Sequence, residues 1–410
     1  MRIAIVLTMC TAVVIAAQSV ALPRAAPELV GLDPNRLKEA TALLNQFVID
    51  KKIAGAVAAV ARNGKVAYLE AVGFQHLESR TPMTERSLFR IYSMTKAVTA
   101  VSAMILHEEG KFDLRDPVSK YLPDFSTVRV LVEPGGQTRP PAREVTVADL
   151  LLHTSGLSHR TSELYQTAKV RSRRSTLPEF ITNIVRVPLM EDPGTRFRYS
   201  EATTVVGRLI EIWSGEPLDV FMRERVFMPL GMLDTGFWAQ PEQRARLTTV
   251  YAAQAGGGLQ PYEIEELPFT ERPVLLEGAV GLLSTVPDFM RFSQMLLNRG
   301  ELNGVRVLSA KTVDLITANS LPEPVLRSRG GGMGWGLANV NVVIDPSVIP
   351  GAPNLGEYGW DGTAGTIFWI DPKDEMVALL MTQSSPANPD SLRQRFKALV
   401  MAARWHTQRK

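Results

Sequence analysis

Ser93 and Lys96 are the residues most able to do covalent chemistry. They stand in Ser93-Met94-Thr95-Lys96, the only Ser-x-x-Lys of the chain, and an apolar run over 97–105 predicts that a buried helix begins there. Positions i and i+3 share a helix face, so the amine lies within reach of the hydroxyl. Because burial disfavours the charged form of lysine, Lys96 can take a proton from a serine nucleophile. The alternative is an ordinary helix start, with Ser93 as a cap and Lys96 solvated.

Other catalytic patterns are absent from the sequence. There is no Gly-x-Ser-x-Gly, His-Glu-x-x-His, Walker loop or Gly-x-Gly-x-x-Gly, which disfavours α/β-hydrolases, zincins and nucleotide-binding proteins. His107 precedes two glutamates, but lysine stands at position 111, so the zinc-ligand spacing fails. His76, His159 and His406 have no acidic partner nearby in the sequence, and we assign them no function. The remaining groups call for no metal and no organic cofactor.

The composition is that of an ordinary globular protein. Its 410 residues contain 45 Lys and Arg against 42 Asp and Glu, a net charge of +3, so nucleic acid is not an expected partner. The first residues differ: Arg2 precedes an apolar run over 3–17, and Ser19-Val20-Ala21 fits a cleavage site. We interpret residues 1–21 as a cleaved signal peptide and expect a periplasmic or secreted protein without a stable membrane anchor. Cleavage would remove Cys10, the single cysteine.

The hydrophobic periodicity predicts strands at both ends of the chain and helices between them. Asp33-Pro34 predicts the start of a helix that runs to about residue 50, and Asn63-Gly64 predicts a hairpin turn between 56–61 and 66–72. A second hairpin over 365–383 precedes a last helix over 392–403. We therefore expect an antiparallel sheet flanked by N- and C-terminal helices, in an α/β domain formed by 22–92 and 271–410, with an all-α domain inserted at 93–270.

Several motifs that occur in one order resemble those of the serine β-lactamase and penicillin-binding-protein superfamily, in its class C-like branch, which includes the family VIII carboxylesterases. The resemblance extends from about Leu32 to the last helix. The motifs are Phe89-Arg90-Ile91-Tyr92-Ser93-Met94-Thr95-Lys96, Asp149-Leu150-Leu151-Leu152-His153-Thr154-Ser155-Gly156-Leu157, Phe197-Arg198-Tyr199-Ser200 and Tyr358-Gly359-Trp360-Asp361-Gly362. It implies the β-lactamase/transpeptidase-like fold, with the active site between the two domains.

The resemblance implies roles for individual residues. Ser93 would be the acylated nucleophile, and Lys96 and Tyr199, the first residue of a Tyr-x-Asn motif, would transfer protons. The backbone amides of Ser93 and Thr363 would form the oxyanion hole. Trp360-Asp361-Gly362 would lie on an edge strand and contact substrate, although Asp361 also fits a plain turn residue. The His153-Thr154-Ser155-Gly156 stretch would support the site, and Ser155 is not expected to be the nucleophile.

Two departures from the family pattern bear on the substrate. Glu201 replaces the asparagine of Tyr-x-Asn, and a carboxylate can only accept hydrogen bonds. Trp360 replaces a lysine, which removes the cation that would pair with a substrate carboxylate. With Glu201, Trp360, Asp361 and Gly362 as substrate-binding residues, we expect neutral or apolar acyl groups and a carboxylesterase acting on a small ester.

Three other functions stay open at this point. The same residues could serve a β-lactamase or D-amino-acid peptidase, or an acyltransferase in which an alcohol or amine replaces water. A non-catalytic cell-wall-binding protein on the same fold is the alternative of another class, and Glu201 is its best support. The sequence does not determine the natural ester or the oligomeric state.

Overall fold

The structure, a computed structural model, describes residues 21–133, 136–254, 256–349, 351 and 353–405. The predicted signal peptide therefore lies outside the described residues, apart from Ala21. None of the helices in the described ranges is both long and apolar enough to cross a bilayer.

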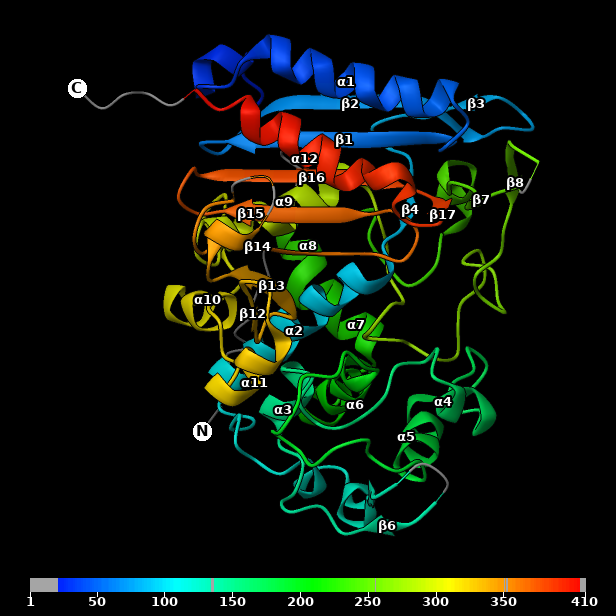
Figure 1. The fold of residues 1–410 in the computed structure, drawn as a ribbon, viewed down its shortest axis with the longest axis vertical. Coiled ribbons are helices and arrows are strands. Elements are labelled where there is room, and N and C mark those ends of the chain that lie inside the picture. Colours follow the sequence, from blue (N-terminus) through cyan, green and yellow to red (C-terminus); the bar gives the residue numbers. More distant parts are fainter. Residues whose placement is uncertain (1–20, 134–135, 255, 350, 352, 406–410) are drawn as a thin grey trace, which may run out of the picture.

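An eight-stranded antiparallel sheet forms the centre of the molecule (Figure 1). It joins the two ends of the chain, because β16 pairs with β1. The predicted β1–β2 turn is present, with positive φ at both Asn63 and Gly64. In spatial order the strands are β12 (Met333–Gly336), β13 (Val340–Val343), β14 (Tyr358–Asp361), β15 (Ile367–Asp371), β16 (Met376–Thr382), β1 (Gly55–Arg62), β2 (Lys65–His76) and β3 (Thr81–Pro82).

The two terminal helices, α1 (Pro34–Ile49) and α12 (Leu392–Ala402), cover one face of the sheet. As predicted, Asp33 caps α1, its side chain accepting from the Asn35 amide. Side chains point alternately to opposite faces of a strand. In β1 the even positions 56, 58 and 60 accordingly join the core with α1 and α12, whereas 57, 59 and 61 face a second, larger core.

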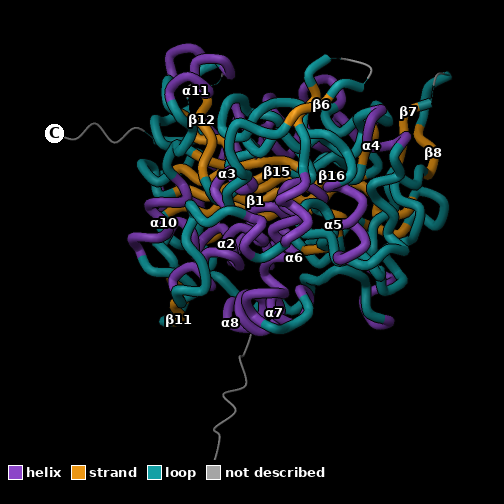
Figure 2. The backbone as a smooth tube through the Cα atoms, turned by 90° about the horizontal axis from the view of Figure 1, so that it is seen from below, coloured by secondary structure: helices purple, strands orange, loops and turns teal. Residues whose placement is uncertain are grey.

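The larger core lies between the sheet and helices α2 (Thr95–Glu108) and α9 (Val286–Leu297), and it continues into the helical region. Figure 2 shows helices α2, α6, α7 and α8 grouped beside the strands of the sheet. The other helices are α3 (Val147–Leu151), α4 (Glu163–Thr167), α5 (Leu177–Val185), α6 (Ala202–Ser214), α7 (Leu218–Met222), α8 (Met228–Leu230), α10 (Ala310–Thr317) and α11 (Glu323–Arg329).

Short paired strands connect the segments between these helices. They pair as β4 (Phe89–Arg90) with β9 (Leu283–Ser284), β5 (Val130–Leu131) with β6 (Thr138–Arg139), β10 (Glu301–Leu302) with β11 (Val305–Arg306), and β7 (Tyr251–Ala253) with both β8 (Leu259–Pro261) and β17 (Ser384–Ser385). The β4–β9 pair ends three residues before Ser93 and so holds the chain that leads into the nucleophile.

β14 is not the edge strand that we expected. It lies inside the sheet, between β13 and β15. Its pairing with β13 involves Tyr358 and Gly359, whereas Trp360 and Asp361 pair with β15 alone among the described strands. The end of β14 that carries Trp360 is thus open on one side although the strand is internal.

Candidate active site

Ser93 and Lys96 lie together at the start of α2. Ser93 is in a 3-10 turn (Tyr92–Met94) that leads directly into the helix, and it is 7% exposed. Lys96 is 0% exposed, and its Nζ donates to Ser93 Oγ at 3.5 Å and to the carbonyl of Ala279 at 3.0 Å. The lysine is therefore the buried partner of the serine that the spacing predicted, and not a solvated residue.

The backbone before the nucleophile is strained. Tyr92 has a φ of +42°, in the left-handed region that non-glycine residues rarely adopt. Its side chain is buried, with an edge contact to Phe269 at 6.1 Å between ring centroids. Packing thus holds a conformation that costs energy and that fixes the direction of the next residue, Ser93.

Tyr199 reaches the same place from the loop before α6. Lys96 Nζ lies 4.7 Å from the centroid of its ring, and Trp360 Nε1 donates to its hydroxyl oxygen at 3.0 Å. The structure thus brings Ser93, Lys96, Tyr199 and Trp360 together from three distant segments. Trp360 thus offers more than an apolar surface, because its N–H is a hydrogen-bond donor to the Tyr199 hydroxyl.

The chain after β14 lies against the segment before Ser93. A Cβ on Gly362 would stand 2.4 Å from the carbonyl oxygen of Ile91, so only glycine permits this approach. Thr366 Oγ1 donates to the same oxygen at 3.3 Å. The amide of Thr363 has no hydrogen-bond partner among the described residues, which leaves it available for the oxyanion hole predicted for it and the Ser93 amide.

Asp361 has a structural partner. Its carboxylate pairs with Arg393 of α12 at 3.0 Å, and Arg393 also donates to the carbonyl of Gly362 at 2.5 Å. Burial raises the pKa of Asp361, and the guanidinium opposes this. The contacts of Asp361 and Gly362 therefore position the Thr363 turn, and the structure shows no second role for the Asp361 carboxylate.

The His153 loop supports Tyr199 from behind. His153 is fully buried, its Nδ1 is hydrogen bonded to Ser200 Oγ at 3.1 Å, and its ring centroid lies 4.7 Å from that of Tyr199. Burial, with the charge of Lys96, holds the pKa of His153 well below its ordinary value, so the imidazole is neutral. Asp149 fixes the loop by accepting from both Arg143 and Thr154.

His159, to which we assigned no function, also lies in the site. Its ring stacks on that of Tyr199, with centroids 5.7 Å apart and an interplanar angle of 29°. Burial lowers its pKa, and its Nδ1 is hydrogen bonded to Thr161 Oγ1 at 2.7 Å. From the sequence we identified no acidic partner for His159, whereas in the structure both the Tyr199 ring and the charge of Glu201 act on it.

Comparisons with known proteins agree with this arrangement. The family described as "Beta-lactamase" matches residues 40–402, most of the chain. Protein Rv1367c of Mycobacterium tuberculosis is 34% identical over 352 residues, which cover 82% of this chain and 86% of that protein. The chain belongs to the β-lactamase family.

Two further comparisons agree with this family and with the fold. Esterase EstB of Burkholderia gladioli is 29% identical, covering 84% of this chain and 89% of that protein. The solved structure of EstCE1, a hydrolase with promiscuous acyltransferase activity, has a TM-score of 0.78 over 90% of this chain and 99% of its own, at 24% identity. The predicted fold and the broad prediction of a β-lactamase-related serine hydrolase are confirmed.

Glu201, predicted to bind substrate, is in the wrong place to do so. Its side chain is 0% exposed, and it stands at the N-cap of α6 facing the interior. Its Oε2 accepts one long hydrogen bond from Thr204 at 3.4 Å, and its Oε1 has no partner in the described structure. In this β-lactamase-family protein the departure from Tyr-x-Asn is therefore a buried carboxylate that is not exposed to substrate.

A cavity of about 570 Å³ adjoins Thr363. Arg160 lines it and also lies over the ring of Tyr92, 6.0 Å from the centroid, whereas Ser93 itself does not line it. Arg160 and Arg171 both pair with Glu265 in its wall. The wall of this cavity therefore includes two arginines paired with one glutamate, and Trp360 is not among the residues that line it.

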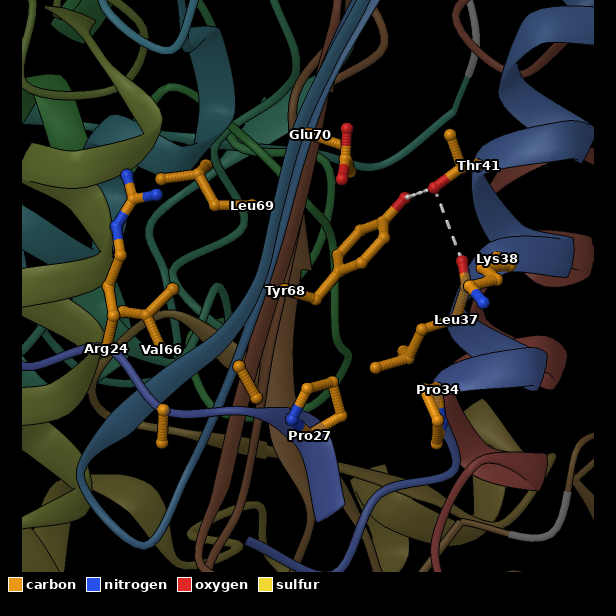
Figure 3. Close-up of a pocket in the computed structure, with 12 residues that line it drawn as sticks. Arg24, Pro27, Pro34, Leu37, Lys38, Thr41, Val66, Tyr68, Leu69 and Glu70 are labelled. Atoms are coloured by element: carbon orange, nitrogen blue, oxygen red, sulfur yellow. Dashed lines mark hydrogen bonds between the residues drawn. The ribbon is translucent and has the colours of Figure 1, made fainter. Parts of the chain in front are cut away.

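A second hollow lies away from this chemistry, between α1 and β2 (Figure 3). Tyr68 points into it and its hydroxyl is hydrogen bonded to Thr41 at 3.0 Å. Burial raises the pKa of Tyr68 to about 12, so the phenol stays neutral. We interpret this hollow as a gap in helix-to-sheet packing.

Proposed function

We propose that this protein is a carboxylesterase that cleaves small esters through an acyl-enzyme on Ser93. The observation that carries the proposal is the hydrogen bond from Trp360 to Tyr199, at 3.0 Å. In the family pattern a lysine at position 360 would offer a charge to a substrate carboxylate, whereas the indole offers one N–H, already given to Tyr199, and an apolar ring. Such a site suits an ester without a carboxylate.

The residues account for each proton of the reaction. Ser93 Oγ attacks the ester carbonyl, and its proton passes to the pair formed by Lys96 and Tyr199. The amides of Ser93 and Thr363 stabilise the oxyanion, and Tyr199 protonates the departing alcohol. Water then attacks the acyl-enzyme, gives one proton to the same pair, and releases the acid as Ser93 regains its hydrogen. If an alcohol takes the place of water, the identical steps give acyl transfer.

The test is labelling of the protein with a fluorophosphonate, read by intact mass, with hydrolysis of p-nitrophenyl butyrate and nitrocefin measured in parallel. We expect one adduct, ester turnover far above nitrocefin turnover, and loss of adduct and turnover in Ser93→Ala. Ser155→Ala is the matched control, since Ser155 is also buried near the site, and it should keep the adduct. Nitrocefin turnover above ester turnover would favour a β-lactamase. The absence of any adduct would favour a binding protein.

We also propose export through a signal peptide cleaved after Ala21. The pairing of the following residues with the sheet supports this: the amide of Val66 donates to the carbonyl of Pro23, and that of Ala25 to Val66. A chain that starts at Leu22 would keep these bonds. N-terminal sequencing of the protein recovered from the periplasm or medium should begin at Leu22, and recovery only from the cytosol with residue 1 retained would refute export.

A further inference from the structure

Glu201 is a buried carboxylate for which the reaction above has no use. It is 0% exposed, and burial of an unpaired charge is costly unless an opposite charge compensates for it. Burial alone would raise the pKa of Glu201, but the charges of Lys96, Arg160, His159 and Arg171 outweigh it and keep the pKa below its ordinary value. The carboxylate is therefore ionised.

Most of these cations have partners of their own. Arg160 pairs with Glu265, and Arg171 pairs with both Glu265 and Glu277. Lys96 differs, because its Nζ bonds only to the neutral oxygens of Ser93 and Ala279 and forms no direct ion pair within the described chain. Lys96 is also the cation with the largest effect on Glu201. Neither the ammonium of Lys96 nor the carboxylate of Glu201 forms an ion pair among the described residues, and Lys96 Nζ lies 4.7 Å from the ring centroid of Tyr199, two residues before Glu201.

The packing of α2 against α6 fixes the two groups with respect to each other. Glu201 stands at the N-cap position of α6, and the carbonyl of Thr203, in the first turn of that helix, lies 2.7 Å from where a Cβ on Gly278 would stand. Thr99 of α2 donates to the carbonyl of Gly278 at 2.7 Å, and the next carbonyl, that of Ala279, accepts from Lys96. The segment 278–279 therefore contacts both α2 and α6 near their N-terminal ends.

We propose that Glu201 is the counter-charge of Lys96, a positioning residue that sets the pH at which Lys96 and Tyr199 become able to take a proton from Ser93. This rests on the proposed acyl-enzyme function. To take the serine proton, Lys96 and Tyr199 must together have lost one of the two protons that they carry as ammonium and phenol. A negative charge nearby favours the state with both protons, so Glu201 moves the onset of activity to higher pH.

Other charged or titratable groups face this cluster and are held constant by the design of the test. Those near Glu201 are His159 and Arg160 from the loop after α3, Tyr165 of α4 and Arg171. Near Lys96, His153 is neutral, as described above. None of them is altered in the variants below.

The first experiment compares the pH dependence of Ser93 labelling by a fluorophosphonate in the wild type and in Glu201→Gln. We expect the acid limb of the rate to move down by about one to two pH units in the variant, the usual size of the effect of one nearby buried charge on a pKa. Glu201→Asp should return the limb toward the wild-type position. Glu211→Gln, on the same helix but paired with Arg208, should leave it unchanged. A limb that stays in place in Glu201→Gln would overturn the proposal.

The second experiment needs no activity, so it separates this proposal from the proposed function. Thermal midpoints are measured for Lys96→Met, Glu201→Gln and the double variant. If the two charges compensate each other, Lys96→Met leaves a buried carboxylate unbalanced, and adding Glu201→Gln should raise the midpoint above that of Lys96→Met alone. If the thermal midpoint of the double variant falls by the sum of the two single losses, the proposal is overturned. If Glu201→Gln does not fold, Glu201→Asn, the family's residue type at that position, replaces it in both experiments.

Discussion

Replacing Trp360 by phenylalanine tests the most unusual contact of the site. The change keeps an aromatic ring and removes the N–H that donates to Tyr199 at 3.0 Å. A hydrogen bond to a charged group contributes about 1.5–3 kcal/mol, and here it acts while the phenolic oxygen carries negative charge. Since about 1.4 kcal/mol is tenfold in rate, kcat/KM for p-nitrophenyl butyrate should fall by roughly 10- to 150-fold.

The acid limb of the pH profile should also move in a defined direction. The indole N–H favours the form of the pair that has lost a proton, so its removal should move the acid limb of kcat/KM to higher pH. The matched control is Trp369→Phe, because Trp369 lies on the next strand and its Nε1 has no partner in the described structure. A Trp360→Phe enzyme with kcat/KM within about twofold of wild type and an unmoved limb would refute the role given to this hydrogen bond.

Two further predictions concern the groups that position the site. Gly362→Ala should displace the Thr363 turn and lower kcat by about 100-fold or more, the cost of one oxyanion donor, with the thermal midpoint as the check on folding. A rise in KM with an unchanged kcat would contradict this prediction. Asp149→Asn should lower the free energy of unfolding by about 2 kcal/mol, since Arg143 and Thr154 lose their charged acceptor. Burial alone would raise the pKa of Asp149, but its hydrogen bonds hold the pKa below the ordinary value. Its contribution should therefore be present at neutral pH and vanish as pH falls below the ordinary aspartate range, and urea denaturation that shows no such pH dependence would count against it.

Much of the fold could be predicted because local signals and tertiary contacts agree. Asp33-Pro34, Asn63-Gly64 and the last helix were each predicted from a short pattern, and each is present in the structure. The position of β14 was not predictable in this way. Its flanking partner β13 (Val340–Val343) is a short run rich in β-branched residues that indicates a strand, but a local pattern does not show beside which other strand it pairs.

In the candidate site, too, local features could be predicted and long-range ones could not. The spacing of Ser93 and Lys96 indicated their contact, because one helical turn determines it. The stacking of His159 on Tyr199 and the burial of Glu201 depend on loops whose shape arises from long-range packing. A residue type two positions from Tyr199 showed that the chemistry had changed, but not that the carboxylate turns inward at the cap of α6.

Glu201 and Trp360 are best understood as one change made in two places. Compared with the family pattern, position 360 loses a positive charge and position 201 gains a negative one, and both alterations make the surroundings of Lys96 and Tyr199 more negative. Each alone would hold protons on the pair and delay activity to higher pH. The Trp360 N–H opposes this by bonding the phenolic oxygen directly, without adding a charge. The same negative shift disfavours a carboxylate on the substrate, whereas a neutral ester is unaffected. Under the proposed function, the same two side chains would both retune the proton-transfer pair and disfavour anionic substrates, so a site with intact Ser93, Lys96 and Tyr199 could differ in substrate from a β-lactamase.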